Sequence, residues 1–330
     1  MYINNKLPFE KLRRKVIVKQ KADPSKDLPG KTDIASIEQL LNYGIINIDK
    51  PAGITSYKTA ERVKRILHIK KTGHGGTLDP LVTGVLPVAL GYATRITQAF
   101  LPAGKEYVCT MHLHKPATKP QIEHVFETFT GIIEQVPPVK SAVRRQKRER
   151  EIYYIEALKI EDRNVTFRVG CQGGTYIRKL VHDMGLALGT GAHMAELRRT
   201  KSGCFTEAAM CTLEELAEAY KKWAQTRDED GLRTVIQPIE NSIQHLGKVW
   251  IHESVIEPIC DGWDVAVPGI MKLHSNINEG ELVAVMTMTD KFIALGDAVL
   301  TSEEMNELQK GISVKVKKVF MKVARKNQNV

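Results

Sequence analysis

The pattern of apolar residues changes along the chain, and this change most limits the folds open to it. Before about residue 245, strand-like runs alternate with stretches whose apolar residues recur every three or four positions, as in helices. Beyond it, short β-like runs at 249–251, 264–267, 281–288 and 292–300 are separated by Gly, Pro and Asn, and Thr289-Asp290 marks a hairpin turn. The sequence therefore predicts an α+β chain in which a larger mixed domain precedes a small β-rich one.

Individual elements can be assigned within the larger part. Alternating or continuous apolar runs predict strands at 44–48, 106–114, 152–160 and 165–169. Helical periodicity predicts helices at 56–68, capped by Ser56, and at 121–129, 176–188 and 213–225. The first residues are polar and basic, with one expected strand at 15–19. The predicted division is an N-terminal arm at 1–40, a mixed domain at 41–245 and a β-rich domain at 246–330.

The net charge of +10 over 330 residues favours a polyanionic partner. Lys and Arg outnumber acidic residues by seven to one in 1–21, by six to one in 140–150 and by six to none in 313–330. A solvated basic surface is the alternative for any one cluster, but three in one chain favour nucleic acid. No membrane span or secretory leader is expected. Five scattered cysteines are typical of the cytoplasm and argue against an in-chain zinc site.

The segment Thr72-Gly-His-Gly-Gly-Thr-Leu-Asp-Pro80 is the strongest candidate for chemistry. Its glycines allow close backbone approach to a ligand, and Pro80 restricts Asp79 toward an extended conformation, so the loop can aim one carboxylate. The alternative is a plain connection between elements, with Asp79 as a turn residue. A phosphate-binding loop is disfavoured because the Gly-x-x-x-x-Gly-Lys-Ser/Thr pattern is absent.

An isolated carboxylate needs a cation to hold it ionised and in place. Arg178, in the first turn of the helix after Gly173-Gly174, is a candidate, although a surface role is the alternative. Tyr107 alternates onto an apolar strand face, where it either joins the core or supports a bound base. His112 and His114 form a His-x-His pair without a third ligand at metal spacing, so no metal site is expected.

These segments resemble the pseudouridine synthases of the TruB type, and among them the archaeal dyskerin-like subunit of H/ACA ribonucleoproteins. Six short motifs occur in the family's order over most of the chain. They are 44–56 (Gly-Ile-Ile-Asn-Ile-Asp-Lys-Pro with Gly-Ile-Thr-Ser), 72–87 with Asp79, Lys105-Glu-Tyr107, 137–142 (Pro-Pro with Ser-Ala), Gly174-Thr-Tyr-Ile-Arg178 and Ala195-Glu-Leu-Arg-Arg199.

The resemblance implies a role for each matching residue. Asp79 is the expected catalytic aspartate, Arg178 its ion-pair partner and Tyr107 the ring that stacks on the target uracil. Four further residues are expected around the substrate: Leu197 walls the pocket, Lys50 with Pro51 supports it, His74 occupies space near the flipped-out base, and Arg144 stands where relatives often have Lys. Segment 140–150 is then the thumb loop over the RNA.

The resemblance also implies fold, chemistry and partners. A mixed, largely antiparallel sheet flanked by helices is expected for the catalytic domain, and a PUA-like RNA-binding domain, joined by the N-terminal arm, for the β-rich part. Uridine is isomerised when N1–C1′ breaks, the base rotates and C5 joins C1′, after the base leaves its stack at a cost of a few kcal/mol. Asp79 either attacks C1′ or removes the 2′ proton to give a glycal, and the sequence leaves both routes open. No cofactor or metal is needed.

The expected partners are a box H/ACA guide RNA, substrate rRNA or tRNA, and three small proteins: a zinc-ribbon-like protein, a small β-barrel protein and a kink-turn-binding protein. Two other functions are alternatives to this one. A non-catalytic RNA-binding scaffold would use the basic arm and the PUA-like domain and convert no uridine. A nucleotide-phosphate-binding enzyme would bind ATP or GTP on the glycine-rich loop, which lacks the required lysine.

Overall fold

The computed structural model describes residues 5–20, 35–136 and 146–321. The described chain forms two compact units, the first from 1–11 and 44–237 and the second from 12–43 and 238–330. Helices and strands occur together in both, as the α+β prediction requires.

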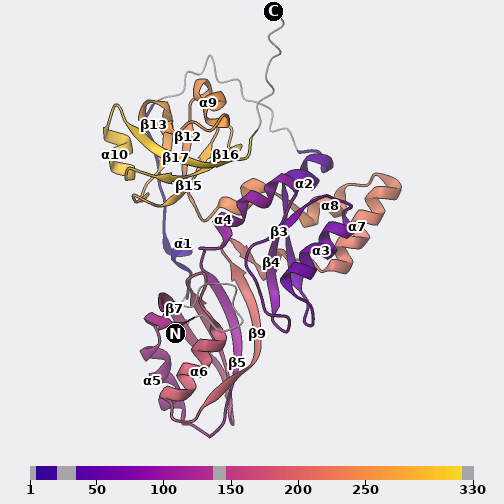
Figure 1. Ribbon diagram of the computed structural model, residues 1–330, viewed down its shortest axis with the longest axis vertical. Coiled ribbons are helices and arrows are strands. Elements are labelled where there is room, and N and C mark those ends of the chain that lie inside the picture. Colours follow the sequence, from indigo (N-terminus) through magenta and orange to yellow (C-terminus); the bar gives the residue numbers. More distant parts are fainter. Residues whose placement is uncertain (1–4, 21–34, 137–145, 322–330) are drawn as a thin grey trace, which may run out of the picture. The chain divides into compact units, whose positions relative to one another are not determined.

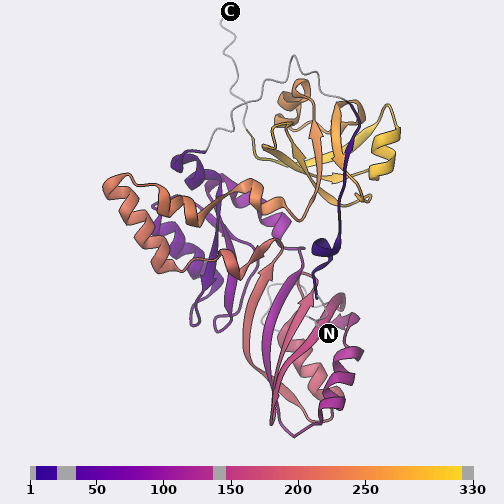
Figure 2. The same ribbon diagram turned by 180° about the vertical axis from the view of Figure 1, so that it is seen from behind.

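The first unit is built on a mixed sheet in which the described residues supply ten strands (Figures 1 and 2). The order is β11-β2-β4-β9-β5-β8-β7-β6, with β3 added to β4 and β10 to β9. The strands are β2 (Gly44–Lys50), β3 (Thr72–His74), β4 (Thr83–Leu90), β5 (Lys105–Leu113), β6 (Gly131–Gln135), β7 (Arg148–Glu161), β8 (Asn164–Cys171), β9 (Ala192–Ser202), β10 (Phe205–Thr206) and β11 (Ile236–Pro238). The β4–β9 pair is parallel, whereas β9, β5, β8, β7 and β6 pair antiparallel in turn.

Two helices, α5 (Lys119–Thr128) and α6 (Ile177–Ala187), cover one face of the sheet at β5, β8 and β7 (Figure 1). Their apolar stripes join Cys109, Met111, Phe167 and other inward residues of β5 and β8 in one buried cluster. Burying these side chains stabilises the unit by roughly 25 cal/mol per Å² of apolar surface. The cluster also fixes where α6 begins, and α6 carries Arg178.

At the other end of the sheet, α3 (Ser56–Ile66) packs against β3 and against α7 (Leu213–Thr226). The short elements of this unit are α1 (Pro8–Lys11), the 3-10 helix η1 (Gly91–Ile96), α4 (Thr97–Phe100), η2 (Glu207–Ala209) and α8 (Asp230–Val235). Thr55, and not Ser56, caps α3 by accepting a hydrogen bond from the Lys58 backbone amide. The expected cap is therefore displaced by one residue, which frees the Ser56 hydroxyl for another contact.

The predicted elements are present, and several features of the first unit differ from the prediction. The start of the glycine-rich segment is a strand, because β3 pairs antiparallel with β4. The strand expected at 152–160 extends over Arg148–Glu161. No strand was assigned at 192–202, where polar residues interrupt the alternation, yet β9 lies between β4 and β5 in the sheet.

The second unit is a β-rich domain whose described residues form a seven-stranded sheet in the order β1-β14-β12-β15-β16-β17-β13. The strands are β1 (Val16–Val18), β12 (Gly247–Ile251), β13 (Val265–Ala266), β14 (Ile270–His274), β15 (Leu282–Met286), β16 (Phe292–Ala298) and β17 (Ile312–Val319). The helical elements are α2 (Ile37–Tyr43), η3 (Ile239–Ile243), η4 (Glu253–Val255), α9 (Ile256–Cys260), η5 (Val267–Gly269) and α10 (Ser302–Glu307). The predicted hairpin is formed by β15 and β16, with Asp290 at φ 60° in its turn.

The N-terminal residues are divided between the two units, unlike the single arm expected at 1–40. The strand predicted at 15–19 is present as β1 and pairs with β14 of the second unit. Residues up to Lys11 belong instead to the first unit, where Leu7 is fully buried and Glu10 pairs with Lys201. The second unit begins again at Pro238, somewhat before the boundary expected near 245.

Candidate active site

The glycine-rich segment leaves the sheet at the end of β3 and forms the loop that carries Asp79. The Gly75 amide donates to the Pro87 carbonyl at 2.8 Å. The buried Ser56 hydroxyl accepts from the Leu78 amide at 2.8 Å and lies 3.2 Å from the Leu78 carbonyl. Because Ser56 fixes the backbone immediately before Asp79, the direction of that carboxylate depends on a residue expected only to cap a helix.

Arg178 forms an ion pair with Asp79 through Nη2 and Oδ2. Both side chains are more than half exposed, so a substrate can reach the carboxylate. Arg178 is the second residue of α6, and the start of that helix is held by Gln135, which exchanges hydrogen bonds with the Tyr176 amide and carbonyl at 2.9 and 3.1 Å. The pair joins two segments about 100 positions apart in sequence.

Tyr107 and Leu197 lie on the neighbouring strands β5 and β9. Tyr107 is 8% exposed, and it belongs to the same buried cluster as Leu78 and Ile177, the residues preceding Asp79 and Arg178. Leu197 is partly buried against that cluster. Tyr107 is thus a core residue, and its cluster includes the residues that adjoin both members of the ion pair. Burial raises the pKa of the Tyr107 hydroxyl, and the charge of Arg199 opposes that rise.

Arg199 is a buried cation that sequence analysis placed in a motif but gave no role. It is 1% exposed and is the register partner of Tyr107 on β9. Its Nε donates to the Val85 carbonyl at 2.7 Å and its Nη2 to the Gly76 carbonyl at 3.2 Å. Burial lowers the pKa of this guanidinium. The missed signal was strand alternation, which places Leu197 and residue 199 on one face once β9 is recognised.

Lys50 is a second buried cation beside the loop. It is 0% exposed, and its Nζ donates to the carbonyls of Pro51, Pro80 and Val82 at 2.9, 3.0 and 2.7 Å. Burial, and then the charge of Arg199, lowers the pKa of Lys50. The hydrogen bonds to Pro80 and Val82 connect the end of β2 to the residues that follow Asp79.

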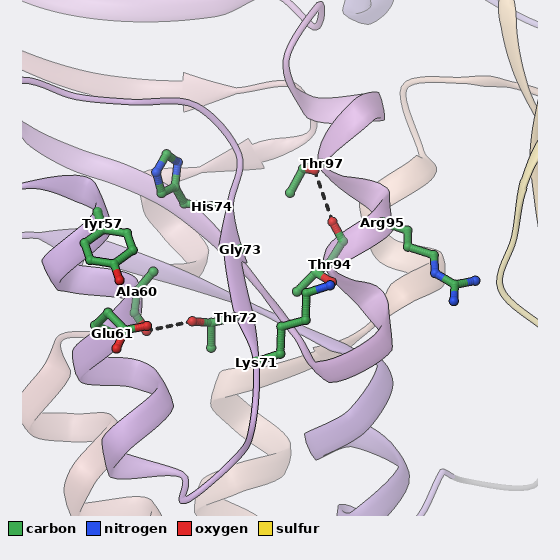
Figure 3. Close-up of a pocket in the computed structure, with 10 residues that line it drawn as sticks. All are labelled: Tyr57, Ala60, Glu61, Lys71, Thr72, Gly73, His74, Thr94, Arg95 and Thr97. Carbon is green, nitrogen blue, oxygen red and sulfur yellow. Dashed lines mark hydrogen bonds between the residues drawn. The ribbon is translucent and has the colours of Figure 1, made fainter. Parts of the chain in front are cut away.

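His74 lines a cavity of about 370 Å³ beside β3. Figure 3 shows Tyr57 of α3 and His74 on one side of β3, with Thr94 and Thr97 on the other. Burial lowers the pKa of His74, and the charge of Arg199 lowers it further, so the neutral imidazole is favoured near neutral pH. Lys71 also lines the cavity and is exposed.

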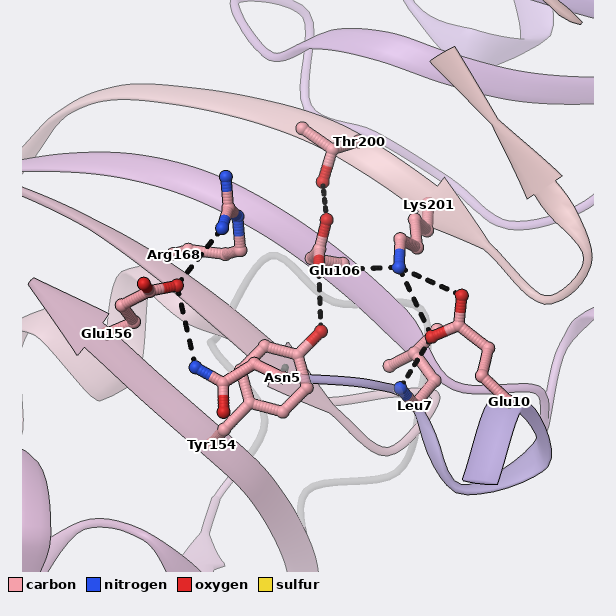
Figure 4. A network of polar contacts seen from close by, with 9 residues as sticks. All are labelled: Asn5, Leu7, Glu10, Glu106, Tyr154, Glu156, Arg168, Thr200 and Lys201. Carbon is pink, nitrogen blue, oxygen red and sulfur yellow. Dashed lines mark hydrogen bonds and ion pairs between the residues drawn. The ribbon is translucent and has the colours of Figure 1, made fainter. Parts of the chain in front are cut away.

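Next to Tyr107, the preceding residue Glu106 is the centre of a polar network (Figure 4). This buried carboxylate accepts from the hydroxyls of Tyr154 at 2.6 Å and Thr200 at 2.8 Å, and Lys201 lies 3.7 Å away. Lys201 in turn pairs with Glu10 of the N-terminal segment at 2.9 Å. The network ties β5 and β9 together next to the site. The sequence indicates only Glu106 and Tyr107 of this group, as parts of one motif.

Two expectations concern residues away from this site. The rings of His112, His114 and His193 lie together, yet no group of three or more His, Cys, Asp or Glu in the described part of the chain is arranged to hold a metal. Arg144 and most of the expected thumb loop lie outside the described residues. No helix in the described ranges is long and apolar enough to cross a membrane.

Comparison with known proteins agrees with this arrangement. Residues 64–177 match the TruB family pseudouridylate synthase (N terminal domain), 178–244 the tRNA pseudouridylate synthase B C-terminal domain and 247–320 the PUA domain. The "probable tRNA pseudouridine synthase B" proteins of Pyrococcus furiosus and Thermococcus kodakarensis are each 51% identical over 312 residues, or 94% of this chain and 92% of theirs.

Solved structures match over nearly the whole chain as well. One from a Cbf5–Nop10–Gar1 complex is 50% identical with a TM-score of 0.89, covering 96% of this chain and 97% of that one. Another, from an H/ACA ribonucleoprotein bound to a substrate RNA containing 2′-deoxyuridine, is 48% identical with a TM-score of 0.87 and covers 96% and 98%. These matches define the class of protein as an RNA pseudouridine synthase, an isomerase. Within that class the chain belongs to the TruB family and carries a C-terminal PUA domain.

Proposed function

We propose that Asp79 is the catalytic aspartate of this synthase and that Arg178, Tyr107 and Leu197 form the pocket around the target uracil. The ion pair between Asp79 and Arg178 is the observation that carries the proposal. A carboxylate paired in this way is kept ionised and aimed while it stays open to substrate. Asp79 then either attacks C1′ of the uridine or removes its 2′ proton.

His74, Lys50 and Arg144 have supporting roles in this proposal. The neutral His74 ring lies in the space that an extruded base leaves, and Lys50 holds the backbone after Asp79. Arg144 and the loop of 140–150 cover the RNA. The cavity beside His74 supports this arrangement, because its exposed Tyr57 and Lys71 offer a ring and a cation, which are groups that bind single-stranded nucleic acid.

The particle in which the enzyme acts is inferred from the similar structures. A chain 48% identical over almost its full length was solved in an H/ACA ribonucleoprotein with substrate RNA, and another with Nop10 and Gar1. We infer that this protein also modifies rRNA under a box H/ACA guide RNA, with such small proteins and a kink-turn-binding protein. Its relatives named as probable tRNA pseudouridine synthases support a further action on tRNA, which we propose takes place without a guide. A cytoplasmic location is part of the same proposal.

The test is release of tritium from RNA labelled at C5 of uridine, because C5 loses its hydrogen when it joins C1′. We expect Asp79→Asn to lower the single-turnover rate by at least about 1000-fold while RNA affinity stays within about threefold. Asp183→Asn is the matched control, since it also removes an ion-paired carboxylate, the partner of Lys179 on α6, and should stay active. The assay is run with and without guide RNA and partner proteins.

Two outcomes would contradict the proposal. Wild-type rates for Asp79→Asn would exclude this residue as the catalytic group. Tight RNA binding by the wild-type protein without conversion, with every RNA and partner added, would favour a binding scaffold.

A further inference from the structure

We propose that Arg199 is a positioning residue for the isomerisation: it holds the Asp79 loop and the Tyr107 ring in register from beneath the pocket. The inference rests on the proposed roles of Asp79 and Tyr107. It adds a residue beneath the pocket, because Arg199 is 1% exposed and its Nε and Nη2 donate to the backbone carbonyls of Val85 and Gly76.

The burial of this charge is unusual because no carboxylate among the described residues forms an ion pair with it. The neighbouring Arg198 provides a contrast, since it pairs with Asp49 at 3.0 Å and with Glu207 at 2.6 Å. Removing a charge from water is costly unless hydrogen bonds replace the lost solvent. Arg199 finds such partners in the backbone carbonyls of Val85 and Gly76 and in the Tyr107 side chain. The position of the guanidinium and the positions of these groups therefore depend on each other.

The contacts of Arg199 reach both parts of the proposed pocket. The Gly76 carbonyl, three residues before Asp79, accepts from Nη2, and a Cβ at Gly76 would lie 3.6 Å from Nη1. Gly76 has φ +126°, a conformation that glycine adopts readily, so the loop turns directly over the guanidinium. On β5, Tyr107 is the register partner of residue 199 and lies within reach of its charge.

The backbone of Arg199 is itself fixed. Residue 199 pairs in parallel with Gly84 of β4, and the Arg199 carbonyl lies so close to Gly84 that a Cβ there would be 2.2 Å from it. The guanidinium therefore extends from a rigid strand to a glycine-rich loop. A planar group with several donors can hold two carbonyls at set directions, whereas a lysine ammonium is a flexible point charge.

The charge of Arg199 also extends through the site. It lowers the pKa of Lys50, His74 and Lys105, which lie on different elements around the loop. Lys105 is 4% exposed, and burial together with this charge lowers its pKa to about 7. The charge of Arg199 on β9 thus acts on three ionisable groups of other elements. Arg199 is therefore placed to organise the pocket as well as to fill core volume.

The experiment compares Arg199→Lys, which keeps the charge but loses the planar group, with Arg199→Met, which loses both. We expect Arg199→Met to lower kcat about 100-fold and Arg199→Lys about 10-fold, with KM for the RNA within about threefold of wild type in both. A displacement of about 1 Å in positioned groups is enough for a loss of that size. Arg198→Met is the matched control on the same strand and should keep wild-type kcat in its folded fraction.

Two results separate positioning from a structural role: lysine restores part of the activity, and kcat changes while KM does not. A purely structural role would instead lower the amount of active protein. Folding is checked by circular dichroism and kcat is expressed per active site. If Arg199→Met does not fold, Arg199→Lys decides. Wild-type kcat in a folded Arg199 variant, or failure of both variants to fold, would overturn the inference. Asp79→Asn is assayed in parallel: if it is inactive while the Arg199 variants are fully active, only the inference fails.

Discussion

Replacing Gly84 by alanine tests how rigidly β4 is packed on β9 beneath the active site. Gly84 has φ +97°, and a Cβ would lie 2.2 Å from the Arg199 carbonyl oxygen, although real Cβ contacts are essentially never under 3.0 Å. The two backbones would have to separate by at least about 0.8 Å, against the pairing of Gly84 with residue 199 and with Lys50. The positive φ costs about 1–2 kcal/mol, and overpacking about 1–3 kcal/mol more. We expect Gly84→Ala to lower the free energy of unfolding by about 2–5 kcal/mol.

Gly131→Ala is the matched control. Gly131 has a similar φ of +106°, at the start of β6, but nothing lies within 4 Å of its Cβ position. Only the conformational cost of about 1–2 kcal/mol should remain there. Urea-induced unfolding followed by circular dichroism measures both variants. Equal losses in the two would refute the argument, because the close approach to Arg199 would then contribute nothing. We also expect the folded fraction of Gly84→Ala to isomerise uridine more slowly, since residue 199 is displaced.

Two further changes test the buried charge of Lys50 and the partly buried imidazole of His274. Lys50→Met removes the donor to the Pro51 and Val82 carbonyls, while the Pro80 carbonyl keeps the Gly53 amide at 2.9 Å. We therefore expect a loss of about 2–4 kcal/mol in the free energy of unfolding and a reduced rate. A loss below about 0.5 kcal/mol in urea titration would contradict this. Burial and the charges of Lys248, Arg14 and Lys272 lower the pKa of His274 to about 4. The unfolded chain therefore takes up a proton between pH 6.5 and 4 that the folded domain does not. The free energy of unfolding of the domain should decrease as the pH is lowered through that window. His274→Gln should flatten this dependence in unfolding experiments at several pH values, and an unchanged slope would argue against it.

The exposed part of the site could be predicted from the sequence better than its support could. Asp79 and Arg178 lie in short segments with distinctive glycines, and the structure brings the two side chains together. Local periodicity also predicted α6 and β5, because each presents a regular apolar face to one core. Such elements can be recognised from the pattern of their own residues alone.

The supporting residues could not be predicted in the same way, because their partners are backbone atoms far along the chain. The Ser56 hydroxyl contacts the backbone of Leu78, a contact that exists only once α3 is packed beside the loop. Nothing in the sequence around Arg199 distinguishes it from Arg198, which is only partly buried and pairs with carboxylates. Strand alternation would have separated the two, but β9 is held in the sheet by its neighbours and carries a mixed polar pattern.

The two buried cations suggest why a loop this rich in glycine can present a carboxylate in one direction. Arg199 binds the Gly76 carbonyl before Asp79, and Lys50 binds the carbonyls of Pro80 and Val82 after it. Neither has a carboxylate partner in an ion pair among the described residues, so both depend on backbone oxygens for compensation. Because each cation would be left without these partners if the loop moved, displacement of the loop costs more than the loss of two or three ordinary hydrogen bonds. Glycine thus supplies the conformation at Gly76 and the buried charges restrict it. The exposed Asp79, paired with Arg178 of α6, is then the part of the loop free to meet RNA.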